Sequence, residues 1–333
     1  MSRLAFERET FTAELLDPRR GFERTRMQVE ARRDPLTGHS ARILPPESFP
    51  PPARHDLERL AAATREGCPF CPERIDGETP RFPPELWPEG RIAAGEAVLF
   101  PNLVPYAKWS AVSVYSPRRH LLPLAELTPS LVAGNLLAQR EFGRAVRAHD
   151  PAARWLSVNA NHLAPSGSSI FHPHLQGSAH PQPTTMQRLL AELPPGRLRA
   201  YLEAERADGA RLLASADGVH WLAAFAPLGP AELRAVVEGA GSLHELPEPR
   251  IEALARGLAA GLGVYDRLGF QSFNLALYGV PGREVLLLRL VARAYVGAAE
   301  RSDAMWSERL HWEAATDLAP ERVAELARPA FAP

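Results

Sequence analysis

The sequence predicts an α+β fold made of two similar halves. In residues 1–183, strand-like runs of apolar and β-branched residues flank one long amphipathic helix. The same order of elements returns, in weaker form, in residues 184–333. One heptapeptide of the first half, Phe171-His172-Pro173-His174-Leu175-Gln176-Gly177, has no counterpart in the second. We therefore predict an internal duplication in which only the first half carries chemistry.

The N-terminal third is expected to contain little regular structure. Residues 1–30 are predicted to be a polar lead-in with at most a short helix. The segment from Ile43 to Arg54 is rich in proline, which lacks the amide hydrogen that a central strand must donate, so we expect it to follow the surface. A short helix is predicted from Asp56 to Arg65, just before the cysteine pair Cys68 and Cys71.

The rest of the first half alternates strands with one helix. Strands are predicted at 97–100 and 111–115, and a helix begins at Thr128 because a capping hydroxyl precedes a proline at the first helical position. The helix should end near His149. A strand at 155–159, a loop of small residues at 163–169 and the strand that contains the heptapeptide complete the unit.

The second half repeats this order after a helical connector at 184–214. Strands are predicted at 221–225 and 233–237, then a helix at 248–268, then strands at 272–277 and 285–290. The tail, 305–330, is predicted to be an amphipathic helix.

Composition excludes several classes of function. The chain has 333 residues and a net charge of -1, so it lacks the basic surface that nucleic acid or an anionic membrane requires. The N-terminus mixes acidic and basic residues without an apolar stretch, and no later run approaches the length of a membrane span. We expect a cytoplasmic enzyme that binds neither nucleic acid nor membrane.

The only two cysteines indicate a metal site. Cys68 and Cys71, together with His120 and His172, form a Cys2His2 set, the ligand chemistry of closed tetrahedral zinc sites. The alternative is a redox pair, but Pro72 and the extended surroundings do not suit the helix start that such pairs occupy. One structural zinc would contribute roughly 10 kcal/mol to folding and would fix the proline-rich segment to the strand bearing His172.

The heptapeptide indicates nucleophilic catalysis. In an extended segment, His172, His174 and Gln176 share one face. A neutral His174 imidazole can attack an α-phosphorus to form a nucleotidyl-histidine, provided that an acceptor such as the carbonyl of His172 holds its other ring nitrogen. Gln176 can donate a hydrogen bond to a phosphoryl oxygen.

The loop before the heptapeptide has the residues of a phosphate-binding segment. Gly167, Ser168 and Ser169 let backbone amides approach an oxygen and add hydroxyl donors. A plain flexible hairpin loop is the alternative. Asn102 and Asn161 are further candidates for substrate binding, although most polar loop residues of this kind are solvated turns.

These motifs resemble the galactose-1-phosphate uridylyltransferases of the histidine-triad superfamily. The resemblance covers nearly the whole chain and is carried by Asp34-Pro35-Leu36-Thr37-Gly38, the cysteine pair, Ser116 to Leu127, Asn161 with Gly167-Ser168-Ser169, His172-Pro173-His174-Leu175-Gln176, and Asp317-Leu318-Ala319-Pro320-Glu321. It implies a duplicated histidine-triad-like fold of two antiparallel half-barrel sheets with packed helices, usually in a homodimer.

The resemblance also implies site roles and substrates. It places zinc on Cys68, Cys71, His120 and His172, a uridylylated histidine at His174, and phosphate contacts at Asn161, Ser169 and Gln176. The implied activity moves a nucleoside monophosphate, UMP in the first instance, from a nucleotide sugar to a sugar 1-phosphate.

The sequence departs from the family pattern at three places. Glu47 and Pro50 stand where the family has basic residues that reach the nucleotide sugar, and residues 303–309 replace its hexose-contacting segment. The second half reads Leu288-Arg289-Leu290-Val291 in place of a histidine-bearing strand, so no second metal is expected. Because rewritten polar contacts change the acceptor, two alternatives stay open: a phosphorylase that uses inorganic phosphate on an ADP or GDP compound, and a catalytically silent zinc-stabilised nucleotide-binding protein.

Overall fold

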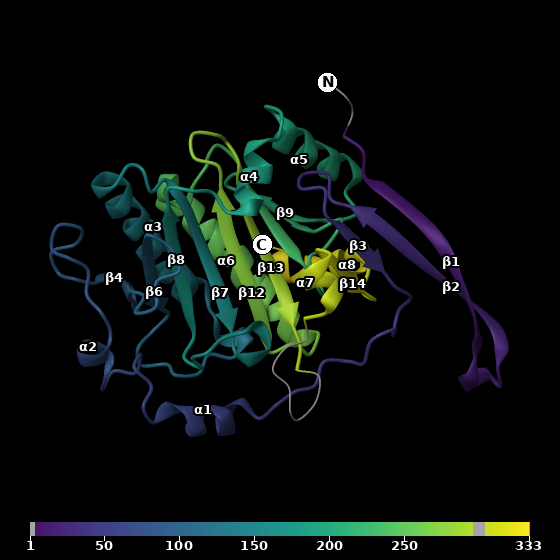
Figure 1. Cartoon of the computed structure of the whole chain (residues 1–333), viewed down its shortest axis with the longest axis horizontal. Helices are drawn as coiled ribbons and strands as arrows, with labels where there is room; N and C mark the ends of the chain where they lie inside the picture. Colours follow the sequence, from purple (N-terminus) through teal and green to yellow (C-terminus); the bar gives the residue numbers. More distant parts are fainter. Residues whose placement is uncertain (1–3, 296–303, 333) are drawn as a thin grey trace.

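Two sheets organise the protein, one of ten strands and one of four (Figure 1). The computed structural model describes residues 4–295 and 304–332. In order across the larger sheet, the strands are β4 (Ile92–Ala94), β5 (Ala97–Pro101), β6 (Trp109–Val114), β8 (His174–His180), β7 (Trp155–His162), β12 (Ser272–Gly279), β13 (Leu286–Arg293), β11 (Leu233–Val237), β10 (Val219–Ala223) and β9 (Leu212–Ala216).

The order of strands in the ten-stranded sheet follows the same pattern when it is counted inward from either edge. From one edge the order is β4-β5-β6-β8-β7, and from the other it is β9-β10-β11-β13-β12, with every neighbouring pair antiparallel. This symmetry is what a duplication requires. The halves are joined because β7 pairs with β12, with Asn161 opposite Asn274. The structure thus differs from the predicted pair of half-barrel sheets, since the two halves form one continuous sheet.

Two long helices cover one face of this sheet and pack against each other. They are α3 (Pro129–His149) and α6 (Glu248–Arg267), both as predicted. Thr128 caps α3 by accepting a hydrogen bond from the Leu131 amide. Leu136 and Phe142 of α3 and Leu254 of α6 are fully buried in the core beneath the sheet. Because α3 and α6 cover this face, a substrate-binding site on the sheet has to lie on the opposite face.

The predicted polar lead-in is wrong. Residues 7–33 form a long hairpin of β1 (Glu7–Asp17) and β2 (Glu23–Arg33), joined by a 3₁₀ turn (Pro18–Arg20). Polar and apolar residues alternate along β2 as in a strand, but the many charged residues of the hairpin make this pattern hard to recognise in the sequence. The hairpin begins the smaller sheet, in which β2 pairs with β3 (Ser40–Ile43), and β3 pairs in parallel with β14 (Glu313–Thr316).

A buried turn ties the smaller sheet to the larger one. Asp34 accepts hydrogen bonds from the amides of Leu36 and Thr37, which closes the Asp-Pro-Leu-Thr-Gly turn. Its other carboxylate oxygen lies 2.6 Å from Arg234 of β11, and both side chains are buried. Although burial alone would raise the pKa of Asp34, the neighbouring Arg234 guanidinium holds it well below its usual range.

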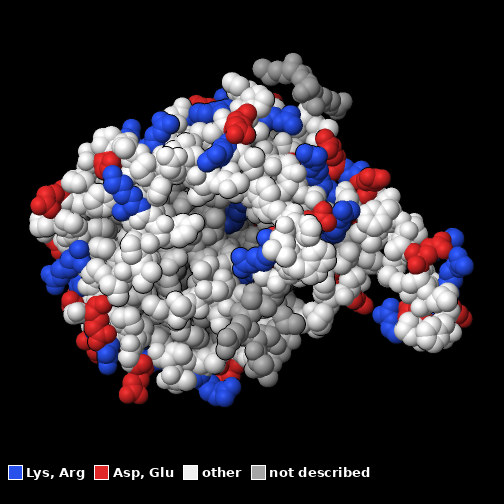
Figure 2. Space-filling model, in the orientation of Figure 1, with Lys and Arg blue, Asp and Glu red and all other residues white. Residues whose placement is uncertain are grey.

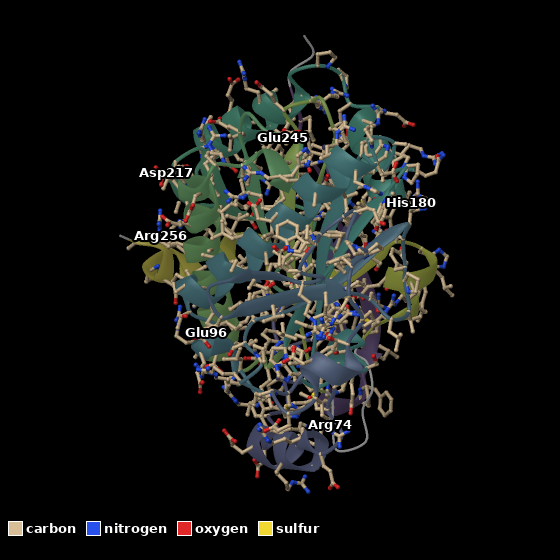
Figure 3. The ribbon with its side chains drawn as sticks, turned by 90° about the vertical axis from the view of Figure 1, so that its left-hand side faces the viewer. Arg74, Glu96, His180, Asp217, Glu245 and Arg256 are labelled. Carbon is tan, nitrogen blue, oxygen red and sulfur yellow. The ribbon has the colours of Figure 1, made fainter. Side chains whose placement is uncertain are left out.

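The remaining helices lie around the two sheets. They are α1 (Leu57–Arg65), α2 (Ile75–Glu78), α4 (Thr185–Ala191), α5 (Arg197–Asp208), α7 (Trp306–Leu310) and α8 (Pro320–Phe331). The predicted helical connector ends earlier than expected, because its last residues form β9. The predicted helical tail is interrupted by β14. On the surface, Asp217 in the β9–β10 turn pairs with Arg256 of α6, 3.2 Å away (Figure 3). Within the described residues, no helix combines the length and apolar character that crossing a bilayer requires.

Candidate functional site

Four buried side chains converge on one point near the start of β8. The ligand atoms of Cys68, Cys71, His120 and His172 all lie within 4.8 Å of one another. The Nδ1 of His172 is 3.7 Å from each sulfur, and the Nδ1 of His120 is 3.4 Å from the Cys71 sulfur. Tetrahedral bonds of 2.3 Å to sulfur and about 2.05 Å to nitrogen place those atoms about 3.5 Å apart. The four residues therefore fit a single metal ion of the zinc type.

The second ring nitrogen of each histidine is also held. The Nε2 of His172 donates to the carbonyl oxygen of Ser116 at 2.9 Å, and the Nε2 of His120 lies 3.0 Å from the Thr64 hydroxyl. Because a carbonyl oxygen can only accept, His172 must carry its proton on Nε2 when neutral, which leaves the Nδ1 lone pair facing the sulfurs. Thr64, on α1, was not predicted from the sequence.

The protonation of this cluster favours a cation. Burial, and then the neighbouring Cys68, raise the pKa of the Cys71 thiol to about 11, while burial lowers the pKa of His172 to about 4. Buried thiolates are costly without a counter-charge, and both imidazoles are neutral at pH 7. A divalent ion supplies the charge that lets the sulfurs ionise, as metal binding at thiolate sites requires.

His174 is the first residue of β8, and its ring is oriented by the backbone. The Nδ1 of His174 lies 2.8 Å from the carbonyl oxygen of His172. The Nε2 makes no hydrogen bond within the described residues, and the side chain keeps 8% of its surface exposed. Burial lowers the pKa of His174, although the bond to the His172 carbonyl opposes this. The imidazole is therefore neutral at pH 7, with its Nε2 lone pair available.

The expectation that His172, His174 and Gln176 share one strand face holds only in part. β8 begins at His174, so His172 precedes the strand and turns to the sulfurs. His174 and Gln176 do stand on one face of β8, opposite Val114 and Val112 of β6. The sequence alternates through this stretch as a strand would, but Pro173 cannot donate a ladder hydrogen bond, and the strand starts after it.

Phe70 connects the metal cluster to His174. It lies between the two cysteines, and its ring packs edge-on against His172 and His174, with centroids 6.1 and 5.5 Å apart. The cysteine loop therefore forms part of the wall around the His174 ring. A metal ion bound by the cysteines and His172 would fix both the cysteine loop with Phe70 and the position of His172, whose carbonyl oxygen holds the His174 ring.

Helix α3 supports β8 from the other side of the sheet. A side chain at Gly177 would place its Cβ 2.2 Å from the Gln139 amide oxygen, so only glycine fits. The Nε2 of Gln139 in turn donates to the Ser113 hydroxyl of β6 at 2.6 Å. Gln176, the residue before this close contact, is half-buried, and no hydrogen bond to its side chain is found among the described residues.

The predicted phosphate loop leaves β7 through a strained turn. Leu163 is buried with a φ of 65°, a value that a branched apolar residue rarely adopts, and Gly167 has a φ of 91°. The Leu163 carbonyl accepts from the Ser166 hydroxyl at 2.8 Å and from the Ser168 amide at 3.3 Å. Ser169 is exposed.

Asn161 meets a residue that the sequence did not indicate. The side-chain amides of Asn161 and Asn274 lie 2.7 Å apart, and Asn274 also donates to the Ser166 carbonyl at 3.0 Å. The second half therefore contributes to the loop, across the β7–β12 junction. A polar residue within the apolar strand Ser272–Gly279 is the one signal that could have pointed to it.

Four other residues lie apart from this cluster. Asn102 follows β5, and its side-chain oxygen accepts from the amide of Val104, 3.1 Å away, as in a simple turn. Glu47 and Pro50 line a pocket of about 970 Å³ between the proline-rich segment and residues 315–318, and no predicted substrate-binding or metal residue lines it. His180, at the far end of β8, lies near the edge of the molecule (Figure 3).

The face of the sheet opposite the long helices is hollowed near its centre (Figure 2). Lys or Arg atoms are visible inside this hollow, over the region of β12 and β13. Two arginines of β13 lie on that face, since the intervening Leu288 and Leu290 enter the core below the helices. Arg289 pairs with Glu232 at 2.6 Å, and Arg293 pairs with Glu308 at 3.2 Å.

Comparison with known proteins gives the fold a context. No family model matches the chain. An uncharacterized protein of Archaeoglobus fulgidus is 29% identical over 316 residues, which cover 89% of this chain and 91% of that protein. An ADP-glucose phosphorylase from Arabidopsis thaliana, with bound ADP-glucose, superimposes with a TM-score of 0.66 at 17% identity, over 90% of this chain and 98% of that one.

A uridylyltransferase structure superimposes with a TM-score of 0.59 at 20% identity, again over 90% of this chain and 98% of that one. A galactose-1-phosphate-uridylyltransferase-like protein from Arabidopsis thaliana gives 0.64 at 18% identity, with the same shares of the two chains. The chain therefore has the same fold as these phosphorylase and uridylyltransferase structures, as the resemblance of its motifs predicts.

Proposed function

We propose that the protein is a nucleotidyltransferase that moves a nucleoside monophosphate, UMP in the first instance, from a nucleotide sugar to a sugar 1-phosphate. The observation that carries the proposal is the orientation of His174. Its Nδ1 is held by the His172 carbonyl at 2.8 Å, which leaves Nε2 as the free nucleophile on the open face of the sheet. A nucleotidyl-histidine is the intermediate that such a nucleophile forms.

The reaction follows as two in-line steps. The Nε2 lone pair attacks the α-phosphorus, the bond from phosphorus to the bridging oxygen breaks, and the sugar 1-phosphate leaves. The ring gains positive charge, and the Nδ1 proton remains in its hydrogen bond with the His172 carbonyl, which stabilises that charge. A phosphate oxygen of the second sugar 1-phosphate then attacks phosphorus, and the bond from phosphorus to nitrogen breaks.

Donors beside His174 can stabilise the transferring phosphoryl group. Gln176 stands two residues along the same strand face, with no hydrogen bond to its side chain found among the described residues. Gly167, Ser168 and Ser169 lie in the loop that precedes the histidines, where amide and hydroxyl donors can meet phosphoryl oxygens. Donors fixed before the reaction are the main source of such stabilisation.

The metal in this proposal is one structural zinc. Cys68, Cys71, His120 and His172 would hold it, and with four protein ligands it leaves no open position for substrate. When bound, zinc supplies folding energy and fixes His172. The chemistry at phosphorus belongs to His174 and its neighbours.

A phosphorylase is the second candidate. It would use the same first step, and inorganic phosphate would take the nucleotidyl group from His174. The likeness in fold to an ADP-glucose phosphorylase favours this candidate. Glu47 and Pro50 also favour it, because they stand where the resembled uridylyltransferases have basic residues that reach the nucleotide sugar. A third candidate is a protein that binds nucleotide tightly and catalyses no transfer.

One assay separates the three candidates. The protein would be incubated with UDP-, ADP- or GDP-sugars and with either labelled sugar 1-phosphate or labelled inorganic phosphate. Label that enters the nucleotide sugar from the sugar 1-phosphate, with no label entering a nucleoside diphosphate from inorganic phosphate, supports the uridylyltransferase-like reaction. Label that enters a nucleoside diphosphate supports the phosphorylase and overturns the first proposal. Nucleotide binding without any transfer overturns both and leaves the silent protein.

A further inference from the structure

The open face of the ten-stranded sheet, opposite α3 and α6, is hollowed near its centre (Figure 2). In β7, β8 and β12, the strand register puts every half-buried residue on this face. Apart from His180 at the edge of the molecule, these residues are Gln176, Asn159, Asn161, Asn274 and Ala276. All but Ala276 carry a side-chain amide, and none carries a charge. Amides both donate and accept hydrogen bonds, so this part of the face suits a ligand rich in hydroxyl groups.

The space beside Gln176 lies on one side of β8. On the β6 side, Val112 stands opposite Gln176, and Val112 and Val114 are buried together with Phe70 of the cysteine loop. On the β7 side the face is open, and the short side chain of Ala276 on β12 leaves room above it. A ligand group beside Gln176 therefore extends over β7 and β12.

Asn159 of β7 is the residue directly opposite Gln176 on that side. Side chains in such a pair have Cβ atoms about 5 Å apart. The Nδ2 of Asn159 donates to the Ser157 hydroxyl at 3.1 Å and lies 3.5 Å from the backbone carbonyl oxygen of Gln176. Because both contacts are made by the nitrogen, the amide is oriented with its oxygen free. The Oδ1 of Asn159 makes no hydrogen bond with the described residues, and it is not one of their enclosed polar atoms.

The chemistry of this oxygen separates its role from that of Gln176. An amide oxygen only accepts hydrogen bonds, so it repels a phosphoryl oxygen and requires a donor. In a sugar 1-phosphate the nearest donor to the phosphate is the hydroxyl on carbon 2, next to the carbon that carries the phosphate. That hydroxyl and the phosphate are close enough together for Asn159 and Gln176 to contact one each.

The other amides on this face are already engaged. The Asn161 and Asn274 amides lie 2.7 Å apart, and Asn274 also donates to the Ser166 carbonyl at 3.0 Å. They hold the loop that follows β7. Asn159 is therefore the amide on β7 whose acceptor remains available to a ligand.

We propose that Asn159 determines specificity for the sugar, because its Oδ1 accepts a hydrogen bond from the hydroxyl on carbon 2 of the sugar 1-phosphate while Gln176 donates to the phosphoryl group. This inference rests on the proposed function and adds to it the side chain that recognises the sugar. It applies equally to a phosphorylase, since a sugar 1-phosphate is released in the first step of both reactions.

The test compares two ligands on wild-type and variant protein, with binding measured by calorimetry in the absence of nucleotide. Glucose 1-phosphate and galactose 1-phosphate would each be compared with their 2-deoxy analogues. We expect the wild type to bind a parent compound about tenfold more tightly than its analogue, since one hydrogen bond is lost. Asn159→Ala should bind the parent about tenfold more weakly and the analogue as well as wild type does, so that the preference disappears.

Two further variants complete the comparison. Asn159→Leu keeps the size of the side chain without its acceptor, and it should lose the preference in the same way. Asn161→Ala is the matched control, because this amide lies on the same face of β7 but is engaged with Asn274. It should change the affinity for parent and analogue by the same factor, so that the preference remains.

The outcomes separate this inference from the proposed reaction. Equal affinity of the wild type for parent and 2-deoxy compounds, or a preference that Asn159→Ala and Asn159→Leu retain, would overturn the role of Asn159 even if His174 is nucleotidylated. A preference that depends on Asn159 in a protein that forms no His174 adduct would support sugar recognition and overturn the transfer reaction. A wild type that binds neither sugar 1-phosphate would overturn the inference.

Discussion

The Nδ1 of His174 lies 2.8 Å from the carbonyl oxygen of His172, and the side chain of His172 faces the sulfurs of Cys68 and Cys71. One residue therefore joins two functions, because its backbone orients the candidate nucleophile while its ring completes the candidate metal site. A change in the position of His172 moves both.

Removal of one metal ligand should cost both metal and stability. We predict that Cys68→Ser protein contains no zinc by elemental analysis and loses about 4 kcal/mol or more of unfolding free energy, since a structural zinc contributes its binding energy to folding. His180→Ala is the control, because His180 is on β8 but outside the cluster. Unchanged zinc content in Cys68→Ser would refute the metal assignment.

Thr64 should tune the metal site through His120. Its hydroxyl lies 3.0 Å from the Nε2 of His120, where it can accept the proton that orients the ring. Loss of such an outer partner typically weakens metal binding about 10- to 100-fold. Thr64→Val should therefore release zinc to a chelator at a correspondingly lower chelator concentration, and Thr64→Ser should restore the wild-type value. Equal zinc affinity for the Val and Ser variants would show that the contact is incidental.

Asn274 should influence catalysis from the second half. Its amide contacts Asn161 and the Ser166 carbonyl, so Asn274→Ala frees the loop before His172. We expect a drop in kcat/KM of about 10- to 100-fold, because small misplacements of reacting groups are costly. Gln271→Ala is the matched control, because Gln271 lies just before β12 and its side chain also makes two hydrogen bonds, both with the backbone of His55. Equal kinetic losses in both variants would contradict a positioning role.

Glu321 should make stability depend on acid pH. Burial would raise the pKa of its carboxyl, but hydrogen bonds from Arg32 outweigh this and hold it at about 2, against a usual 4.5. Stability from a lowered carboxyl pKa is present above 4.5 and is lost as pH falls toward 2. Glu321→Gln should be about 3 kcal/mol less stable than wild type at pH 7, and this gap should close as pH falls through that window.

The control for this prediction lies on the same helix. Glu325 is exposed and, among the described residues, pairs with Arg322 alone, one turn away, at 2.8 Å. Glu325→Gln should change the unfolding free energy little at any pH, since exposed pairs contribute little. A gap between Glu321→Gln and wild type that stays constant from pH 7 to pH 3 would show that the carboxylate is not the stabilising group.

The sequence predicted best what local chemistry decides. Thr128 with Pro129 marks the start of α3, and its apolar stripe is buried as expected. Cys68, Cys71, His120 and His172 lie together in an arrangement that fits one metal ion, and the Nδ1 of His174 lies beside the His172 carbonyl, as expected from the motif. In each of these examples, the spacing of the residues along the sequence is enough to predict the local structure.

What the sequence did not indicate depends on distant pairing. Asn274 meets Asn161 only because β7 and β12 join the two halves, and Thr64 reaches His120 only because α1 packs beside the cysteine loop. The sequence predicts a polar lead-in where the structure has the β1–β2 hairpin, because the alternating Met27, Val29 and Ala31 lie among many charged residues. An alternating pattern among so many charges indicates a strand only when the strand that pairs with it is also known, as β1 is for β2.

Transfer of a nucleotidyl group to His174 can be measured directly, as the mass of the intact protein after brief incubation with a nucleotide sugar and no acceptor. We predict that the intact chain gains the mass of one nucleoside monophosphate, that the added group maps to the peptide containing His174, and that His174→Ala protein gains nothing. An adduct of the same mass on the His174→Ala protein, or on a peptide that lacks His174, would show that His174 is not the nucleophile.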